Sequence, residues 1–286
     1  MTVAARRSND QSGRGRSGLR DRLRIAPGSK VRLADIDPAA THGHTKAEAE
    51  ADLARGLDRL TSLQDRLWAE AKHPVLIVLQ GIDASGKDGT VRHVMTAFNP
   101  MGCTVTSWKA PTPIELAHDY LWRIHQATPA KGMIGIFNRS HYEDVLVVRV
   151  KNIVPKQVWS RRYEQINEFE HMLDDNRVKV LKFFLHVSRD EQTKRLRDRL
   201  SDPAKNWKFR AGDLDDRNLW GDYTKAYRDA IRQCSTPWAP WYVVPADDKK
   251  ARNYLIARTM VETLDNLGLR FPKADPDVLK LRRKLK

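Results

Sequence analysis

The feature that most constrains this chain is the segment Gly81-Ile-Asp-Ala-Ser-Gly-Lys-Asp-Gly89, which matches the pattern G-x-x-x-x-G-K. An apolar run at residues 75–79 precedes it, and a helix pattern at residues 87–98 follows it. This order of strand, loop and helix is typical of a phosphate-binding loop, in which backbone amides and a helix N-terminus surround an anion. The alternative is a glycine-rich turn between a strand and a helix.

Strand and helix patterns alternate along most of the sequence. Strands are predicted at residues 75–79, 104–108, 133–137, 178–187 and 241–244. Helices are predicted at residues 45–72, 87–98, 115–125, 158–173, 189–200, 213–233 and 252–267. Such alternation indicates an α/β fold with right-handed βαβ units and a parallel sheet covered on both faces. Ligands of these sheets bind at the carboxyl ends of the strands, where residues 81–88, 138–144 and 188 onward should meet.

Two carboxylates accompany the phosphate-binding pattern. Asp88 stands where the motif ordinarily has the Ser or Thr that touches Mg²⁺, and Asp83 lies inside the loop. A bare carboxylate repels phosphate, so Asp83 is predicted to hold a divalent cation between itself and phosphate oxygens. Lys87 can reach a terminal phosphate as a point charge. Capping of the following helix is the alternative for both carboxylates.

A second polar cluster, Asn138-Arg-Ser-His-Tyr-Glu-Asp144, directly follows the predicted strand at residues 133–137. Glu143 and Asp144 are candidates for a second Mg²⁺ carboxylate. Arg139 is suited to clamp a phosphate with two hydrogen bonds. His141 and Tyr142 are interpreted as structural.

Positive charge is concentrated at the two ends and in one internal segment. The chain carries a net charge of +15, of which residues 1–30 contribute +6 and residues 270–286 contribute +5. We therefore predict a folded domain at residues 31–269 between a flexible basic N-terminal tail and a basic C-terminal tail. The basic segment around Arg195, Arg199 and Lys208 is interpreted as a helical lid spanning about residues 189–217.

Composition restricts the cellular setting. No apolar run approaches the roughly 20 residues that a membrane-spanning helix needs, and the N-terminus lacks the apolar segment of a secretory signal. The two cysteines, Cys103 and Cys234, have no metal-ligand spacing. These observations predict a cytosolic protein without a membrane partner.

Taken together, the motifs resemble those of the polyphosphate kinase 2 family, and within it of the class III members. The matching segments are residues 81–89, 109–111, 132–144, 182–186, 206–209 and 238–246. The resemblance covers nearly everything except the tails. It implies a P-loop kinase-like, three-layer αβα fold with a parallel central sheet and a helical lid.

The resemblance also implies an activity and a set of site residues. The activity is Mg²⁺-dependent phosphoryl transfer from inorganic polyphosphate to AMP and ADP, with Mn²⁺ as a possible substitute metal. Asp83 and Asp144 would hold the metal. Residues expected to contact phosphate or polyphosphate are Gly81, Ala84, Ser85, Gly86, Lys87, Asp88, Gly89, Arg195, Arg199 and Lys208. Residues expected at the nucleotide are Lys109, Asn138, Arg139 and Glu143. Asn138 with Glu143 is the class III pairing, and family members suggest a homo-oligomer, a dimer or tetramer.

Two other functions are compatible with parts of the sequence. One is a nucleotide or small-metabolite kinase of the same fold that uses ATP as its donor. The other is a nucleic-acid-binding protein whose basic tails do the binding, although no recognition-module signature is present. The choice of phosphoryl donor and the effect of deleting the tails distinguish these alternatives from the first.

Overall fold

The computed structural model describes residues 18–209, 212–281 and 284 of the 286-residue chain. A wholly parallel five-stranded sheet lies at its centre in the order β2-β3-β1-β4-β5. The strands are β1 Val75–Gln80, β2 Cys103–Ser107, β3 Ile134–Asn138, β4 Lys179–His186 and β5 Trp241–Pro245. Every residue of β1 is buried, since strands flank it on both sides and helices cover both faces. The predicted parallel α/β fold is confirmed.

The helices follow the predicted alternation but break more often. They are α1 Leu19–Leu23, α2 Lys46–Glu70, α3 Lys87–His93, α4 Pro113–Leu116, α5 Trp122–Gln126, α6 Val147–Val150, α7 Lys156–Trp159, α8 Arg162–Asp175, α9 Arg189–Ser201, α10 Gly212–Asn218, α11 Trp220–Cys234, α12 Lys249–Asp265 and α13 Pro276–Lys280. The predicted helix at residues 115–125 is divided into α4 and α5. The predicted helix at residues 213–233 is interrupted before Trp220.

Residue chemistry explains where the longest helix begins and ends. The Thr45 hydroxyl accepts from the Glu48 amide, and the Glu48 carboxylate accepts from the Thr45 amide, which forms a capping box for α2. Ala71 ends the helix in the left-handed conformation, with φ of 49°. Pro74 keeps the chain from continuing as a helix, and β1 begins at the next residue. The phosphate-binding loop directly follows this central strand.

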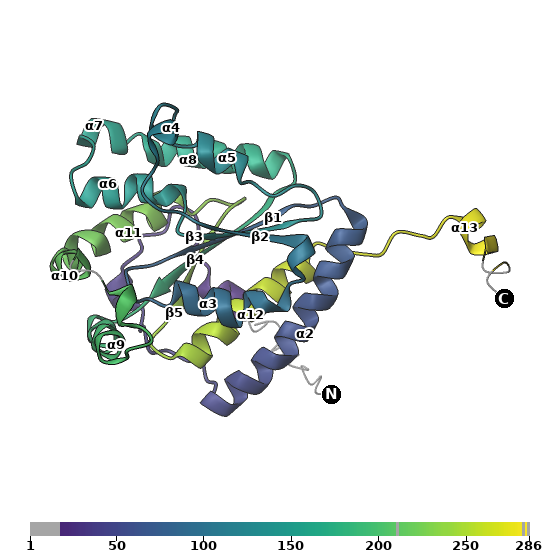
Figure 1. Ribbon diagram of the computed structural model, residues 1–286, viewed down its shortest axis with the longest axis horizontal. Helices are drawn as coiled ribbons and strands as arrows, with labels where there is room; N and C mark the ends of the chain where they lie inside the picture. The colour runs from purple at the N-terminus through teal and green to yellow at the C-terminus, as the bar shows by residue number, and fades with distance from the viewer. Residues whose placement is uncertain (1–17, 210–211, 282–283, 285–286) are drawn as a thin grey trace, which may run out of the picture.

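Alternate residues of β1 pack into two separate apolar clusters. Ile77 and Leu79 belong to the cluster covered by α2 and α12, whereas Leu76 and Val78 belong to the cluster covered by α8 and α11. The sheet therefore lies between two helical layers (Figure 1). This arrangement confirms the three-layer αβα architecture.

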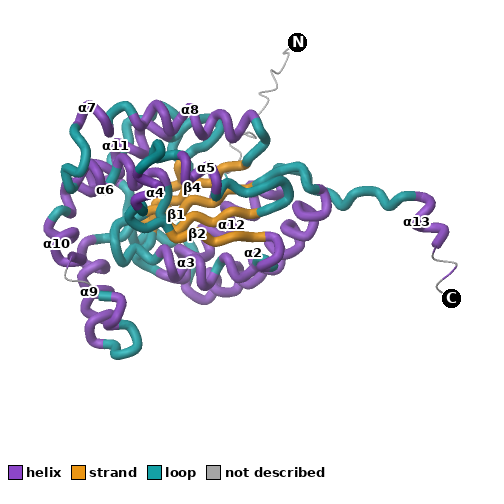
Figure 2. Tube along the Cα trace, turned by 45° about the horizontal axis from the view of Figure 1, so that its top comes forward, coloured by secondary structure: helices purple, strands orange, loops and turns teal. Residues whose placement is uncertain are grey.

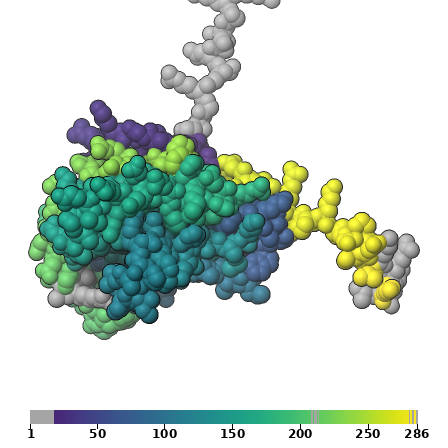
Figure 3. Space-filling view, turned by 90° about the horizontal axis from the view of Figure 1, so that it is seen from above, coloured from purple at the N-terminus to yellow at the C-terminus, as the bar shows by residue number. Residues whose placement is uncertain are grey.

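The ordered domain includes residues assigned to the N-terminal tail by the sequence pattern. Leu23 of α1 is buried, and the Ile25 amide donates to the Trp241 carbonyl at 2.8 Å. These contacts fix residues 19–25 against α12 and β5, although this segment was expected to be flexible. Residues 1–17 lie outside the described part. At the other end, residues 270–281 leave the body and carry α13 away from it (Figures 1 and 3).

The predicted lid corresponds to α9, the 3₁₀ turn Asn206–Lys208 and α10. It follows β4 and projects from the body (Figure 2). Residues 210–211 lie outside the described part. Among the described residues, no helix is both long enough and apolar enough to cross a membrane.

Candidate active site

The phosphate-binding loop, residues 81–89, joins β1 to α3 through an unusual backbone path. Gly86 has φ of 107° and Ala84 has φ of 60°, both in the left-handed region. A Cβ atom added at Gly86 would displace the guanidinium of Arg252, and the left-handed conformation of this position favours glycine in any case. Backbone conformations of this kind are concentrated at functional sites.

Lys87 lies inside the loop, with only 7% of its surface exposed. Its Nζ donates to the Gly81 carbonyl at 2.7 Å and to the Ile82 carbonyl at 3.3 Å. Burial and the nearby Arg139 lower the pKa of Lys87 to about 8, while Asp83 opposes that shift. The ammonium is thus held at the centre of the loop, where a bound phosphate would restore its preference for the charged form.

Asp83 faces the lid. Its Oδ2 accepts from Nη1 of Arg199 at 3.2 Å, and its carbonyl accepts from Nε2 of Gln192 at 3.0 Å. Burial acts to raise the pKa of Asp83, but Lys87 and Arg199 outweigh it and hold the pKa below its ordinary value. The carboxylate is therefore ionised and only partly buried, as a ligand for a hard cation must be.

Neither carboxylate of the loop caps α3. The cap position is Gly86, which makes no side-chain capping bond. Asp88 instead accepts from Nδ2 of Asn138 at 2.8 Å, which ties the start of α3 to the end of β3. The helix-capping alternative is wrong for Asp83 and Asp88 in this structure.

The predicted polar cluster after β3 lies beside the loop, as the sheet order requires. Arg139 adopts a left-handed conformation with φ of 66°, and its Nη1 lies 3.4 Å from Oε2 of Glu143. Glu143 is the leading reason that the pKa of Arg139 is raised, and Asp83 contributes. Arg139 thus stands between carboxylates of two neighbouring strand ends.

Asp144 pairs with a helix behind the site. Its Oδ1 accepts from Nη1 of Arg162 at 3.1 Å. Burial raises the pKa of Asp144 to about 6, against the opposing effects of Arg162 and Arg123. Among the described residues, no three His, Cys, Asp or Glu side chains form a metal-binding group. Asp83 and Asp144 each present a partly buried carboxylate, the kind of oxygen ligand that a divalent cation takes beside phosphates.

The other predicted site residues differ in their exposure and in their hydrogen-bond partners. Arg195 is 9% exposed and donates to backbone carbonyls at the loop, which differs from the expectation that it faces a phosphate chain. Lys109 is exposed just beyond β2, and its carbonyl accepts from Arg123. The Lys208 side chain lies outside the described part.

Sequence reasoning missed several buried polar residues that support the site. Gln80, at the end of β1, donates to Oγ of Ser140 at 3.1 Å and accepts from the Tyr227 hydroxyl at 3.2 Å. These bonds join three elements directly beneath the loop and Arg139. The only signal in the sequence was a glutamine at the end of an apolar strand. His141 and Tyr142 are fully buried, which confirms their structural interpretation.

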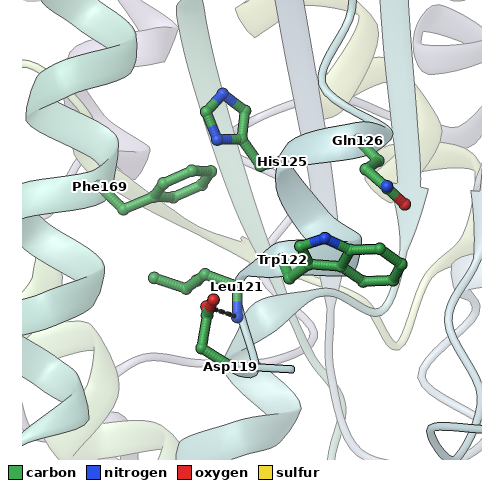
Figure 4. Close-up of a pocket in the computed structure, with 6 residues that line it drawn as sticks. All are labelled: Asp119, Leu121, Trp122, His125, Gln126 and Phe169. Carbon is green, nitrogen blue, oxygen red and sulfur yellow. Dashed lines mark hydrogen bonds between the residues drawn. The ribbon is translucent and has the colours of Figure 1, made fainter. Parts of the chain in front are cut away.

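A separate surface depression of about 340 Å³ lies between α5 and α8 (Figure 4). Its lining residues are Asp119, Leu121, Trp122, His125, Gln126 and Phe169. None of the predicted site residues lines it. The charged groups of the phosphate-binding loop and of the neighbouring strand ends therefore lie outside this depression.

A phosphate-binding loop on the central strand of a parallel sheet, with a basic lid beyond it, defines a kinase of the phosphate-loop class. Residues 43–271 match the family model described as polyphosphate kinase 2 (PPK2). The chain therefore belongs to the polyphosphate kinase 2 family, and it is an enzyme of the phosphotransferase type.

Named relatives span almost the whole chain. It is 53% identical over 257 residues to the AMP/ADP-polyphosphate phosphotransferase of Meiothermus ruber, covering 89% of this chain and 96% of the relative. It is 40% identical over 280 residues to the ADP-polyphosphate phosphotransferase of Rhodopseudomonas palustris, covering 92% and 97%. The crystal structure of polyphosphate kinase 2 from Arthrobacter aurescens TC1 superposes with a TM-score of 0.90 at 42% identity, covering 94% and 96%.

Proposed function

We propose that this chain transfers phosphoryl groups from inorganic polyphosphate to AMP and ADP, which forms ADP and ATP. The observation that carries the proposal is the convergence of Lys87, Asp83 and Arg139 at one edge of the sheet, where cations alternate with carboxylates. Phosphate groups can pair with these cations, and a metal ion bound to the phosphates can pair with the carboxylates. The names of the relatives from Meiothermus ruber and Rhodopseudomonas palustris support the same donor.

Each cation has a role in the proposed reaction. Lys87 and the loop amides hold a phosphate at the transfer point, and Arg139 contacts the transferring group. Arg199 and Lys208, on the lid, neutralise the polyphosphate chain, which carries about one charge per phosphate. Charge that spreads over a transferring phosphoryl group is stabilised by such fixed cations.

The metal in this proposal is Mg²⁺, for which Mn²⁺ could substitute. Kinases of this family are phosphotransferases that typically need a divalent metal. Asp83 and Asp144 would hold it, since partly buried carboxylates are hard oxygen ligands. The bound metal would neutralise charge on the phosphate oxygens.

No protein nucleophile or general base is needed. The terminal phosphate oxygen of AMP or ADP is already ionised and can attack the donor phosphorus in line. Positioning of donor and acceptor therefore provides most of the rate. On this view the site residues orient the two phosphates and stabilise charge, without moving a proton.

Acceptance of both AMP and ADP is proposed from the pairing of Asn138 with Glu143. Asn138 bonds to Asp88, and Glu143 bonds to Arg139, so both residues touch groups at the transfer point. The relative from Meiothermus ruber, 53% identical, is named for both acceptors. Lys109 lies beyond the neighbouring strand and is proposed to contact the nucleotide.

The first experiment incubates the purified protein with long-chain polyphosphate, MgCl₂ and either AMP or ADP, without ATP. Nucleotide products are separated by chromatography, with Asp83→Asn protein in parallel. ADP and ATP formed from AMP, and lost with the variant, would support the proposal. If only ADP reacts, the inference from Asn138 and Glu143 is wrong. If neither reacts but ATP serves as donor, an ATP-dependent kinase takes its place.

A cytosolic location and a homo-oligomeric state stay predictions of the sequence.

A further inference from the structure

Arg195 of α9 uses all five of its N–H donors on the protein itself. Nη1 donates to the carbonyls of Ala84 and Ser85, both at 3.0 Å. Nη2 donates to the carbonyls of Ala246 at 2.6 Å and Asp247 at 2.9 Å. Nε donates to Oε1 of Glu191 at 2.8 Å. A guanidinium has no sixth donor with which to bind a substrate phosphate.

These bonds determine which way the loop peptides face. Because a peptide unit is planar and trans, a carbonyl held on one side directs the next amide to the other side. Arg195 holds the Ser85 carbonyl, so the Gly86 amide points away from the guanidinium. It also holds the Ala84 carbonyl, so the Ser85 amide closes the turn on the Ile82 carbonyl at 3.1 Å.

Arg252 of α12 packs against the same loop at Gly86. It is 2% exposed, and it lies so close to Gly86 that an added Cβ would reach its Nη1. Its own hydrogen-bond acceptor is Oδ1 of Asn253, at 2.8 Å from Nη2. Residues from α9, α12 and the connection after β5 therefore support one face of the loop.

We propose that Arg195 is a positioning residue, which presets the phosphate-binding loop and links it to the lid helix, and that it is not a ligand of the phosphate chain. The inference rests on the proposed function, since it concerns how that function's loop is shaped. Arg199, one helical turn further along α9, differs in reaching the loop through the side chain of Asp83. Arg195 and Arg199 thus have separate tasks.

Replacement by lysine separates the two possible roles of Arg195. Lysine retains a point charge for a phosphate but has three donors in place of a planar set of five. Arg195→Lys should therefore lower kcat by about 10- to 100-fold, with little change in the KM for polyphosphate, because the loop loses its alignment. A rise in KM with kcat retained would overturn the proposal.

Salt dependence gives a second readout. The logarithm of polyphosphate affinity falls with the logarithm of salt concentration, with a slope set by the number of charge contacts. Arg199→Gln should make this slope shallower by about one, as loss of a phosphate contact does. Arg195→Gln should leave the slope unchanged, because all five donors of Arg195 are already bound by acceptors of the protein. An equal loss of slope in both variants would overturn the proposal.

Hydrogen exchange separates a misaligned loop from a poorly folded variant. Exchange of peptides covering residues 81–89 should be faster in free Arg195→Lys than in the free unaltered enzyme, while peptides of β3 exchange alike in both, because only the loop loses donors to its carbonyls. Equal exchange at residues 81–89 in the two proteins would overturn the proposal. Arg228→Lys, at an exposed position on α11, is the matched control for the kinetics. Unaltered enzyme that lacks activity with polyphosphate would contradict the proposed function itself, independently of Arg195.

Discussion

Nη1 of Arg199 lies 3.2 Å from Oδ2 of Asp83, so a lid arginine pairs with the carboxylate of the phosphate-binding loop. Both side chains are partly exposed, at 21% and 28%. Such pairs contribute only about 0–1 kcal/mol to stability. The pair is therefore better explained by what each group does with substrate than by folding.

The first prediction separates stability from function at this pair. Arg199→Gln should shift the thermal unfolding midpoint by no more than about 2 °C, because the pair is solvated. It should raise the KM for polyphosphate about tenfold, since the lid loses a cation that faces the chain. Calorimetry and initial rates would check this. A large drop in the midpoint without a change in KM would contradict it.

The second prediction concerns alkaline pH. The pKa of Lys87 is lowered to about 8, so free enzyme loses this positive charge as the pH rises through that value. We expect kcat/KM for polyphosphate to fall above pH about 8, whereas kcat holds to higher pH because bound phosphate favours the ammonium. Lys87→Arg should remove the alkaline fall in phosphate affinity, since arginine stays charged. An unchanged pH profile in this variant would contradict the assignment.

The same shift has a consequence for stability, and its sign is opposite to that of a favourable ion pair. Between pH about 8 and the ordinary lysine value of 10.5, the unfolded chain binds the proton that the folded Lys87 has lost. The contribution of Lys87 to the free energy of unfolding should therefore increase across this window. Comparison of urea unfolding of the native chain and Lys87→Met at pH 7 and pH 9.5 would measure it.

The sequence predicted the sheet because the strands at residues 75–79, 133–137 and 178–187 are short, mostly apolar runs, which are typical of a parallel sheet covered on both faces. It also predicted the loop, because the spacing of Gly81, Gly86 and Lys87 is local. It failed at helix breaks such as that before Trp220, which the helical propensity of residues 213–233 does not mark.

The site was only half predictable for a related reason. Asp83 and Arg139 were identifiable from their places after strands, but their partners were not. Arg199 is 116 residues from Asp83, and Tyr227 is 147 residues from Gln80. Sequence spacing carries no information on such pairs. Arg195 is an example: as a basic residue on the lid it was expected to face phosphate, but it binds backbone carbonyls.

The third prediction tests the backbone of the loop. Gly86→Ala places a methyl group where Nη1 of Arg252 lies and forces alanine to adopt φ of 107°. We expect a loss of stability of about 1–3 kcal/mol and a loss of kcat of about 100-fold. Gly221→Ala is the matched control, because a Cβ there meets nothing within 4 Å and lies in α11. That control should keep its activity and gain a few tenths of a kcal/mol, up to about 1 kcal/mol.

The fourth prediction concerns a buried ion pair behind the site. Lys182 and Glu170 are fully buried, and Nζ of Lys182 donates to the Glu170 carboxylate at 2.5 Å and to the Cys234 carbonyl at 2.6 Å. The same carboxylate accepts from the Tyr142 hydroxyl at 2.9 Å and lies 3.2 Å from Nε2 of His141. The cluster therefore anchors the segment that carries Glu143 and Asp144.

Removal of one partner from this pair should be far more damaging than removal of both. Lys182→Met removes the cation that pairs with the buried Glu170 carboxylate and should cost about 3–5 kcal/mol in urea unfolding, whereas Lys182→Met with Glu170→Leu should recover most of that loss. Burial acts to raise the pKa of Glu170, but Lys182 and His141 hold it below 4.5. The carboxylate's contribution to stability is thus complete above pH about 4.5 and lost as the pH falls through the folded pKa. A double variant as unstable as the single one would show that the pair itself, and not the uncompensated charge, stabilises the fold.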